Sequence, residues 1–263
     1  MTVLRGAPSV PRVLRVRMDG ALVWLSWESA GAPRLVFSTR RGGVSPPPYQ
    51  SLNLGLSTRD DPTRVEENRA RLLKAAGGEA ARLATAGQVH GTDVRVVTAA
   101  GHHSGCDALL TDRPGIALAV SGADCAPVLL WGPGAVAAVH AGWRGAADGI
   151  AGAAVRSLAA RTPCAPAEVR ALIGPCIRAC CYPVGPEVLA RFDASAHVVR
   201  DGTTRLDLAR AIGMDLERSG VREWHDVGRC TSCEVEWFYS HRRDRGVTGR
   251  QWGLVIIDQA HAA

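Results

Sequence analysis

Short apolar runs bounded by turn residues recur along most of the chain, and each predicts a strand. They cover residues 35–38, 83–87, 94–97, 115–120, 126–131, 135–139, 170–173, 235–239 and 252–257. Longer helical patterns cover residues 63–76, 146–161, 186–192 and 207–219. The strands and helices do not alternate with regular βαβ spacing. The pattern therefore favours an α+β fold with mixed sheets over a doubly wound parallel sheet.

Two neighbouring predicted strands are flanked by soft metal ligands, one before the first strand and one after the second. The runs 126–131 and 135–139 are separated by the turn residues Gly132-Pro133-Gly134, so we expect them to pair as a hairpin. Cys125 comes directly before the first strand and His140 directly after the second. A hairpin of this register would bring the thiol and the imidazole to the same end.

A third soft ligand, His90, lies in another glycine-containing segment, Gln88-Val89-His90-Gly91. Two imidazoles and one thiolate favour a catalytic metal site, because structural zinc sites usually take all four ligands from the protein. Imidazole and thiolate serve both zinc and copper, so zinc is expected and copper stays possible. The alternative without a metal is a buried free cysteine beside two hydrogen-bonded histidines.

Length and linker composition predict a single domain over residues 1–263. The chain is long enough for one large domain or two small ones, and no Ser/Gly-rich linker divides it. Arginines interrupt residues 3–18, which excludes the apolar core of a signal peptide. No stretch of about 20 residues is apolar enough to span a bilayer. We therefore expect no membrane partner and a cytoplasmic location.

The positive charge of the chain is carried almost entirely by arginine. The formal net charge is +6 at pH 7, and Lys74 is the only lysine. The arginines are scattered and are not interleaved with aromatic residues, so we do not expect nucleic acid as a partner. The planar guanidinium binds phosphate oxygens in pairs, so a phosphate-using substrate fits this composition better.

Five further cysteines lie in two later segments, with Cys176, Cys180 and Cys181 in one and Cys230 and Cys233 in the other. The second segment holds one C-x-x-C pair. A structural zinc site would need another such pair, and the adjacent Cys180-Cys181 is a poor one. We therefore expect free thiols in a packed interior.

Several segments over about residues 35–257 occur in the order of one family. They are Ser38-Thr39-Arg40-Arg41-Gly42-Gly43, Ser51-Leu52-Asn53-Leu54-Gly55, Gln88-Val89-His90-Gly91, Asp107-Ala108-Leu109-Leu110-Thr111, Ala123-Asp124-Cys125-Ala126-Pro127, His140-Ala141-Gly142-Trp143-Arg144-Gly145, Cys180-Cys181-Tyr182 and Phe238-Tyr239-Ser240-His241-Arg242-Arg243-Asp244. The chain resembles the laccase-domain proteins, long described as multicopper polyphenol oxidases and now regarded as purine nucleoside phosphorylases with adenosine deaminase activity. Gly122, Pro183 and His241 depart from the usual family residues, which bears on substrate preference.

The resemblance implies a fold, a metal and substrates. The fold would be a single-domain α/β/β/α sandwich, and the metal a zinc ion held by His90, Cys125 and His140. The substrates would be small purine nucleosides and phosphate. Adenosine and phosphate would give adenine and ribose 1-phosphate, inosine would react similarly, and adenosine would also be deaminated.

Roles for further residues follow from that expected chemistry. Arg40, Arg144 and Arg242 or Arg243 are expected to hold the phosphate against the sugar. Asn53 is expected to orient a ribose hydroxyl or the base. In deamination a metal-activated water would attack the purine, and Asp124 would carry the protons. The expected catalytic set is thus Asp124 and Arg144 together with the ligands Cys125 and His140.

Three other functions remain open from the sequence. In a cysteine hydrolase, Cys125 would be the nucleophile and His140 the base, and editing of peptidoglycan precursors is a related role proposed for bacterial members of the family. A copper-dependent polyphenol oxidase would need many histidine ligands, and the chain has eight scattered histidines. A non-enzymatic protein would use its cysteine-rich loops only to pack against a partner. The oligomeric state, the preferred nucleoside and the main reaction stay open.

Overall fold

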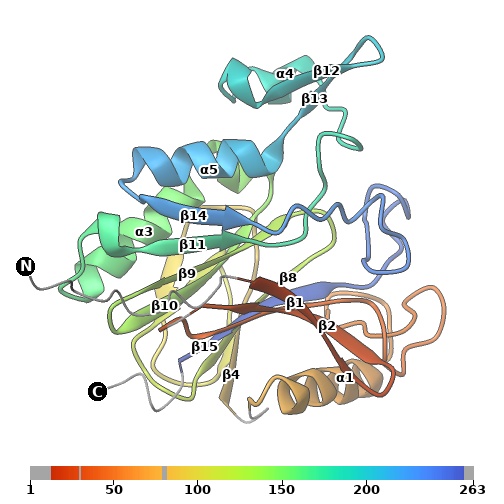
Figure 1. Cartoon of the computed structure of the whole chain (residues 1–263). Helices are drawn as coiled ribbons and strands as arrows, with labels where there is room; N and C mark the ends of the chain where they lie inside the picture. The colour runs from red at the N-terminus through yellow and green to blue at the C-terminus, as the bar shows by residue number, and fades with distance from the viewer. Residues whose placement is uncertain (1–12, 30, 79–81, 258–263) are drawn as a thin grey trace, which may run out of the picture.

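Two large mixed sheets and one small one make up the β-structure of the computed structural model, which describes residues 13–29, 31–78 and 82–257 (Figure 1). The remaining parts of the predicted domain 1–263 lie outside the described residues. Among the described residues, none of the helices has the length and apolar character needed to cross a membrane.

The first sheet has seven strands, and its order differs from their order along the chain. In spatial order they are β1 (Val13–Asp19), β2 (Leu22–Glu28), β3 (Arg34–Ser38), β15 (Gln251–Ile256), β8 (Ala117–Gly122), β4 (Leu83–Ala86) and β6 (Gly101–His103). The pairs are antiparallel except that β4 runs parallel to both β8 and β6.

The second sheet has six strands and holds the predicted hairpin at its centre. In spatial order they are β14 (Glu223–Asp226), β11 (Arg170–Ile173), β9 (Ala126–Gly132), β10 (Ala135–Ala141), β7 (Ala108–Thr111) and β5 (Val94–Val96). The outermost pair at each edge is parallel and the inner pairs are antiparallel. A separate hairpin joins β12 (His197–Arg200) to β13 (Thr203–Leu206).

The helices cover the outer faces of the two sheets (Figure 1). They are α1 (Pro62–Ala75), α2 (Trp143–Ala147), α3 (Ile150–Arg161), α4 (Pro186–Leu189) and α5 (Leu208–Arg218), with short 3₁₀ turns η2 (Pro166–Glu168) and η3 (Ala194–Ala196). Helix α1 lies on the seven-stranded sheet, and α3 and α5 lie on the six-stranded sheet. Helix α4 and the β12–β13 hairpin lie beyond α5, away from both large sheets.

Alternating side chains of the strands build three apolar layers. On β9, Leu129 and Trp131 face the seven-stranded sheet and pack with Leu118 and Val120 of β8. The intervening Val128 and Leu130 face α3 and α5. Because successive strand residues point to opposite faces, one strand serves two layers. The predicted α/β/β/α sandwich with mixed sheets is confirmed.

Most of the predicted elements are present, and their differences from the prediction have local causes. Helix α1 begins where expected, because the Asp61 side chain accepts a hydrogen bond from the Thr63 N–H at 2.9 Å. The predicted helix 146–161 is broken at Gly149, whose left-handed backbone separates α2 from α3. The predicted helix 186–192 ends early, at Leu189.

The predicted strand 235–239 is wrong. Its backbone forms turns, in which the N–H groups of Trp237 and Phe238 both donate to the carbonyl oxygen of Glu234, at 2.9 and 3.0 Å. Backbone groups used within a turn are not available to a neighbouring strand. The prediction also omitted several strands, namely β1, β2, β6, β7, β12, β13 and β14.

The hairpin of β9 and β10 brings its two candidate ligands to one end, as predicted. His140 pairs with Pro127, and Ala141 pairs with Ala126, the residue that follows Cys125. Residues 123–125 connect β8 in one sheet to β9 in the other. The candidate thiol therefore lies where the chain crosses between the sheets.

Candidate metal centre

The three predicted metal ligands converge. The ligand atoms of His90, Cys125 and His140 all lie within 4.8 Å of one another. His90 Nε2 lies 3.9 Å from Cys125 Sγ, and the two imidazole rings meet edge to face with their centroids 5.0 Å apart. Two loops and the end of β10 thus supply one mixed nitrogen and sulfur set.

A fully buried carboxylate, Asp107, holds two of these ligands in place. Its Oδ1 lies 2.9 Å from His140 Nδ1. The same carboxylate accepts hydrogen bonds from the backbone N–H groups of Val89, His90 and Gly91, at 3.1, 2.9 and 2.8 Å. Because Nδ1 of His140 is engaged by Asp107, its Nε2 is the atom left for a metal.

The loops around the ligands contain backbone conformations that are unfavourable for ordinary residues. His90 has a φ of 64° and Asp124 a φ of 98°, and such positions cost about 1–3 kcal/mol each. Gly142 is required for a different reason, since a Cβ there would lie 2.9 Å from the His90 ring and 3.0 Å from Cys125 Sγ. The hydrogen bonds of Asp107 help to hold this strained geometry.

The electrostatics of the site favour charged forms of both a ligand thiol and a ligand imidazole. Burial would raise the pKa of Cys125, but His140 and His90 outweigh it and lower that pKa from 9.0 to about 6. Burial would lower the pKa of His140, but Cys125 and Asp107 raise it from 6.5 to about 9. The thiolate form that binds metals is therefore present at neutral pH.

The donor set fits zinc. In a tetrahedral zinc site, a nitrogen and a sulfur ligand lie about 3.6 Å apart, since the Zn–N and Zn–S bonds are about 2.0 and 2.3 Å. The distance of 3.9 Å between His90 Nε2 and Cys125 Sγ is close to this value. Three protein ligands would leave a fourth position for water or substrate.

The three ligands open into a cavity of 1010 Å³. This volume suits a nucleoside together with phosphate, since ligand pockets commonly measure about 300–1,000 Å³. The cavity has aromatic walls, made by Trp143, Tyr182 and Trp252. Its arginines are Arg69, Arg144, Arg242 and Arg250.

Two of the predicted phosphate-binding arginines, Arg144 and Arg242, line this cavity. Arg144 lies on α2, and its guanidinium carbon is 4.4 Å from the centre of the Trp143 ring. In the described part of the chain the guanidinium of Arg144 has no hydrogen-bonding partner. Arg242 lies 5.0 Å over the Tyr182 ring and donates to the carbonyl of Pro183 at 2.8 Å. The guanidinium of Arg144 is therefore the one left most available to a ligand.

The structure does not bring Arg40 into the cavity. Its Nε and Nη1 atoms donate to the backbone carbonyls of Gln50 and Val235, at 3.0 and 3.1 Å, and it lies 4.9 Å over the Tyr239 ring. It lines a separate surface depression. These contacts show that Arg40 holds loops together outside the cavity, and its expected substrate-binding role stays a prediction.

Arg243 also lies outside the cavity lining, and its guanidinium is occupied by protein groups. It donates to the Asp244 carboxylate, with two contacts of 2.8 Å, and to the carbonyls of Thr231 and Phe238, at 2.9 and 3.0 Å. No guanidinium nitrogen remains without a protein acceptor among the described residues. The contacts of Arg243 are those of a structural residue.

Asn53 is fully buried and does not reach the cavity. Its side-chain nitrogen donates to Thr58 Oγ1 and to Asp60, both at 2.9 Å. Its side-chain oxygen accepts from the backbone N–H groups of Gly55 and Arg250. Asn53 therefore holds the backbone beside Arg250, and its predicted role in orienting the substrate stays a prediction.

Asp124 lines the cavity, but both of its carboxylate oxygens are already bonded. One accepts from the Thr231 hydroxyl and the other from the backbone N–H of Arg242, each at 2.7 Å. These contacts connect Asp124, the residue before Cys125, to the segments that contain Thr231 and Arg242. The predicted proton-carrying role of Asp124 stays a prediction.

Asp107, Arg69 and Arg250 are functional-site residues that were not predicted from the sequence. Asp107 begins the segment Asp107-Ala108-Leu109-Leu110-Thr111 that resembles the family, and this resemblance is the one signal that could have found it. Arg69 projects from α1 and lies 5.0 Å over the Trp252 ring. Nothing local in the sequence indicates that Arg69 and Arg250 share a cavity with His90.

A sequence model of the family described as "Multi-copper polyphenol oxidoreductase laccase" matches residues 34–258. The chain belongs to this family. It is 44% identical over 228 residues to a purine nucleoside phosphorylase of Deinococcus radiodurans, covering 83% of this chain and 87% of that protein. It is 39% identical over 245 residues to the purine nucleoside phosphorylase YfiH of Escherichia coli, covering 90% and 98%.

A crystal structure from the same family has the same architecture. The structure of YlmD from Geobacillus stearothermophilus superposes with a TM-score of 0.87 at 34% identity, covering 95% of this chain and all of that one. The family predicted from the sequence is therefore confirmed, and its fold is the sandwich described above.

Replacing Asp107 by asparagine tests the role of the buried carboxylate. The amide retains the shape but turns an N–H₂ group toward backbone donors. We expect the free energy of unfolding to fall by about 2–4 kcal/mol. Zinc affinity should fall about 10- to 100-fold, measured by competition with a chelating dye. The control is Asp93→Asn, an exposed residue of the same region. Unchanged stability and zinc affinity in Asp107→Asn would contradict this role.

The lowered pKa of Cys125 predicts its reactivity in protein stripped of metal. A thiol reacts as the thiolate, which is present above its pKa. The alkylation rate of Cys125, followed by peptide mass spectrometry, should rise as the pH passes through about 6 and be suppressed by zinc. Cys164, whose pKa is raised by burial, is the control and should stay slow in the same digest. A midpoint near 9 for Cys125 would rule out the charged pair with His140.

Proposed function

We propose that this chain is a zinc-dependent purine nucleoside phosphorylase. It converts adenosine and phosphate to adenine and ribose 1-phosphate, acts similarly on inosine, and deaminates adenosine more slowly. The observation that carries the proposal is a three-ligand metal set opening into a cavity beside Arg144, whose guanidinium has no hydrogen-bond partner in the described part of the chain. The relatives named purine nucleoside phosphorylase support the reaction class.

Zinc is the proposed metal, held by His90, Cys125 and His140, and copper remains an alternative with the same ligands. When bound, it supplies a Lewis acid beside the substrate. Asp107 keeps the His140 ring turned toward the metal. It also holds the strained His90 loop in place. The protein thus prepares the ligand set before any substrate arrives.

In the proposed phosphorolysis, a phosphate oxygen attacks C1′ of the ribose while the bond from C1′ to the purine N9 breaks. Arg144 binds the phosphate through its planar fork, and Arg242 lies on the same cavity. Holding phosphate and sugar in contact accounts for much of the acceleration, because it replaces a chance encounter by a fixed orientation.

The departing purine keeps the electron pair of the broken bond and is stabilised by a hydrogen-bond donor close to its ring. Tyr182 lines the cavity, and burial together with the nearby Cys125 thiolate raises the pKa of its hydroxyl to about 12. The hydroxyl therefore stays protonated at neutral pH and is available as a neutral donor. Trp143, which is partly buried and lines the cavity, offers apolar surface for the base.

We assign Asp124 a positioning role within this proposal. Its carboxylate holds the Thr231 hydroxyl and the Arg242 backbone, and its own backbone carbonyl accepts from Ile177 at 2.9 Å. These contacts fix the loop that presents Cys125.

None of the eight cysteines forms a disulfide, which supports the proposal of a reducing, cytoplasmic location.

The cysteine-hydrolase alternative has one observation in its favour. Cys125 has a lowered pKa beside a protonated His140, as an activated nucleophile would, and a substrate such as a peptidoglycan precursor would then be attacked by the thiolate. A bound metal would occupy that thiolate. The laccase reaction is disfavoured, because only His90 and His140 among the described histidines belong to a cluster able to hold a metal.

Products from adenosine test the proposed reaction. With phosphate present, mass spectrometry should find adenine and ribose 1-phosphate, with inosine forming more slowly. His140→Ala should lose both reactions, and His197→Ala, on β12 outside the cavity lining, is the control. A chelator should abolish turnover and zinc should restore it. If turnover survives chelation but ends on alkylation of Cys125, the thiolate carries the reaction without a metal, as the cysteine-hydrolase alternative requires.

Arg144→Lys tests the phosphate clamp. Lysine keeps the charge but loses the paired hydrogen bonds, so we expect the KM for phosphate to rise roughly 10- to 100-fold. Zinc content should stay the same, because Arg144 is not a ligand. Arg156→Lys, an exposed change on α3, is the matched control. An unaltered phosphate dependence in Arg144→Lys would remove this residue from the mechanism.

A further inference from the structure

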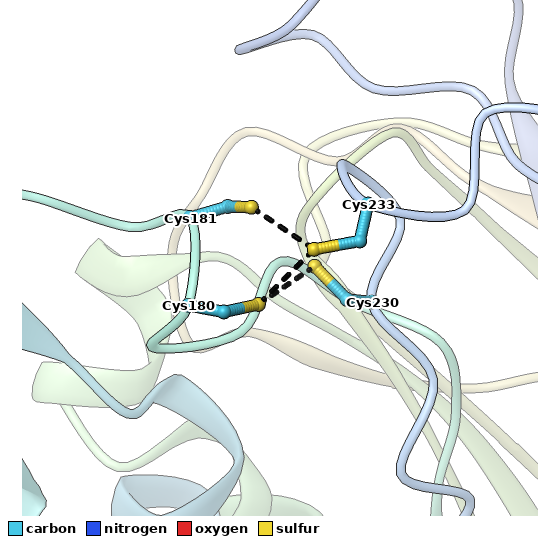
Figure 2. Close-up of side chains that lie close together, drawn as sticks. All are labelled: Cys180, Cys181, Cys230 and Cys233. Atoms are coloured by element: carbon cyan, nitrogen blue, oxygen red, sulfur yellow. Dashed lines mark hydrogen bonds between the residues drawn. The ribbon is translucent and has the colours of Figure 1, made fainter.

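Four cysteines outside the candidate metal centre also converge. The sulfur atoms of the second cluster all lie within 4.8 Å of one another, and they belong to Cys180, Cys181, Cys230 and Cys233. Figure 2 shows one pair on each of two loops, with all four side chains directed toward a common centre. The first loop lies between β11 and α4 and the second between β14 and β15.

The expectation that these residues are interior thiols is therefore corrected. Cys230 is buried, but Cys180 and Cys181 are half-buried and Cys233 is exposed. Apolar packing does not explain why an exposed thiol points at three others. The adjacent pair Cys180-Cys181, which was expected to be a poor zinc-binding pair, supplies the second half of a four-sulfur set.

The spacing of the sulfurs suits a single ion. Cys180 Sγ lies 3.5 Å from Cys230 Sγ and 3.3 Å from Cys233 Sγ, and Cys181 Sγ lies 3.2 Å from Cys233 Sγ. A tetrahedral zinc ion with four Zn–S bonds of about 2.3 Å would place its ligands about 3.8 Å apart. An iron–sulfur cluster spreads its four cysteine ligands over two or more iron atoms, so its ligand sulfurs do not all lie this close together.

We propose that a structural zinc ion is bound here by four thiolates, those of Cys180, Cys181, Cys230 and Cys233. Four protein ligands close the coordination sphere, which is typical of structural sites. This site is chemically distinct from the His90 set, which has three ligands and an open cavity. The inference does not depend on the proposed phosphorylase reaction.

Backbone contacts bring the two loops together at this place. Cys176 forms a parallel bridge with Cys230, in which the Cys176 N–H donates to the Arg229 carbonyl at 3.3 Å. The Thr231 N–H donates to the Cys176 carbonyl at 3.1 Å. The loops are thus already aligned beside the ligands, so a metal would join segments that are some 50 residues apart in the chain.

Positive charge next to the cluster suits a tetrathiolate zinc site, whose net charge is −2. Arg205 donates to the Cys180 carbonyl at 2.5 Å, and its buried Nε–H has no acceptor among the described residues. Arg243 donates to the Thr231 carbonyl at 2.9 Å. Arg205 therefore brings a positive charge to the first loop, whereas the charge of Arg243 is already paired with Asp244.

The proposed zinc would stabilise the wall of the substrate cavity. Tyr182, which lines the cavity, directly follows Cys181. Thr231, between Cys230 and Cys233, donates to Asp124 beside Cys125. The four-cysteine site would hold these residues in place without contacting the substrate. Its loss should therefore reduce stability before it affects chemistry.

Metal content distinguishes the two sites. By plasma mass spectrometry, the purified wild-type chain should hold about two zinc ions, and Cys233→Ser and Cys125→Ser about one each. Cys164→Ser, remote from both clusters, is the control and should hold two. Cys233 is exposed, so its replacement leaves no buried cavity. We expect Cys233→Ser to lower the Tm by about 5–15 °C, since zinc binding contributes folding free energy.

A second measurement uses the wild-type protein and needs no variant. Native alkylation followed by peptide mass spectrometry should leave the exposed Cys233 unmodified while zinc is bound and modify it after chelation. Wild-type protein with one zinc, and the same content in Cys233→Ser, would overturn the proposal. Disulfides within the cluster, or iron in place of zinc, would also overturn it. Loss of zinc only in Cys125→Ser would refute this site and leave the first one standing.

Discussion

The geometry of the candidate metal centre depends on the burial of one carboxylate. Asp107 is fully buried, and a buried charge is costly unless it is hydrogen-bonded and paired. Its oxygens meet three backbone N–H groups of the His90 loop and the imidazole of His140. Burial would raise the pKa of Asp107, but these contacts lower it below 3.8. The residue thereby joins two separate segments into one ligand set.

Asp124 has a comparable role between the two proposed metal sites. It precedes the ligand Cys125, and its carboxylate holds Thr231, which lies within the second cysteine loop. Its carbonyl holds Ile177 in the first cysteine loop. In this arrangement the open three-ligand site would carry the chemistry and the closed four-cysteine site would support the structure. Asp124 contacts the loops of both sites, so a change at the four-cysteine site would reach the three-ligand site through it.

The cavity also shows why residue type alone is a weak guide to phosphate binding. Arg40, Arg144 and Arg243 all lie in segments that resemble the family. The guanidinium groups of Arg40 and Arg243, however, donate to carbonyls or carboxylates of the protein itself. Arg144 stacks on Trp143 instead, which leaves its fork for a ligand. A guanidinium is useful to a substrate only where the fold has not already satisfied its donors.

The sequence by itself determined the local parts of this protein. A short turn between two apolar runs is enough to pair β9 with β10, so it placed Cys125 beside His140, and the family segments added His90. Only the tertiary structure decided which donors are already satisfied and which distant loops meet. The contact of Asp107 with His140 and the approach of the Cys180 and Cys230 thiols were decided in this way. Contacts between segments far apart in the chain depend on the packing of both sheets and leave no periodic pattern in the sequence.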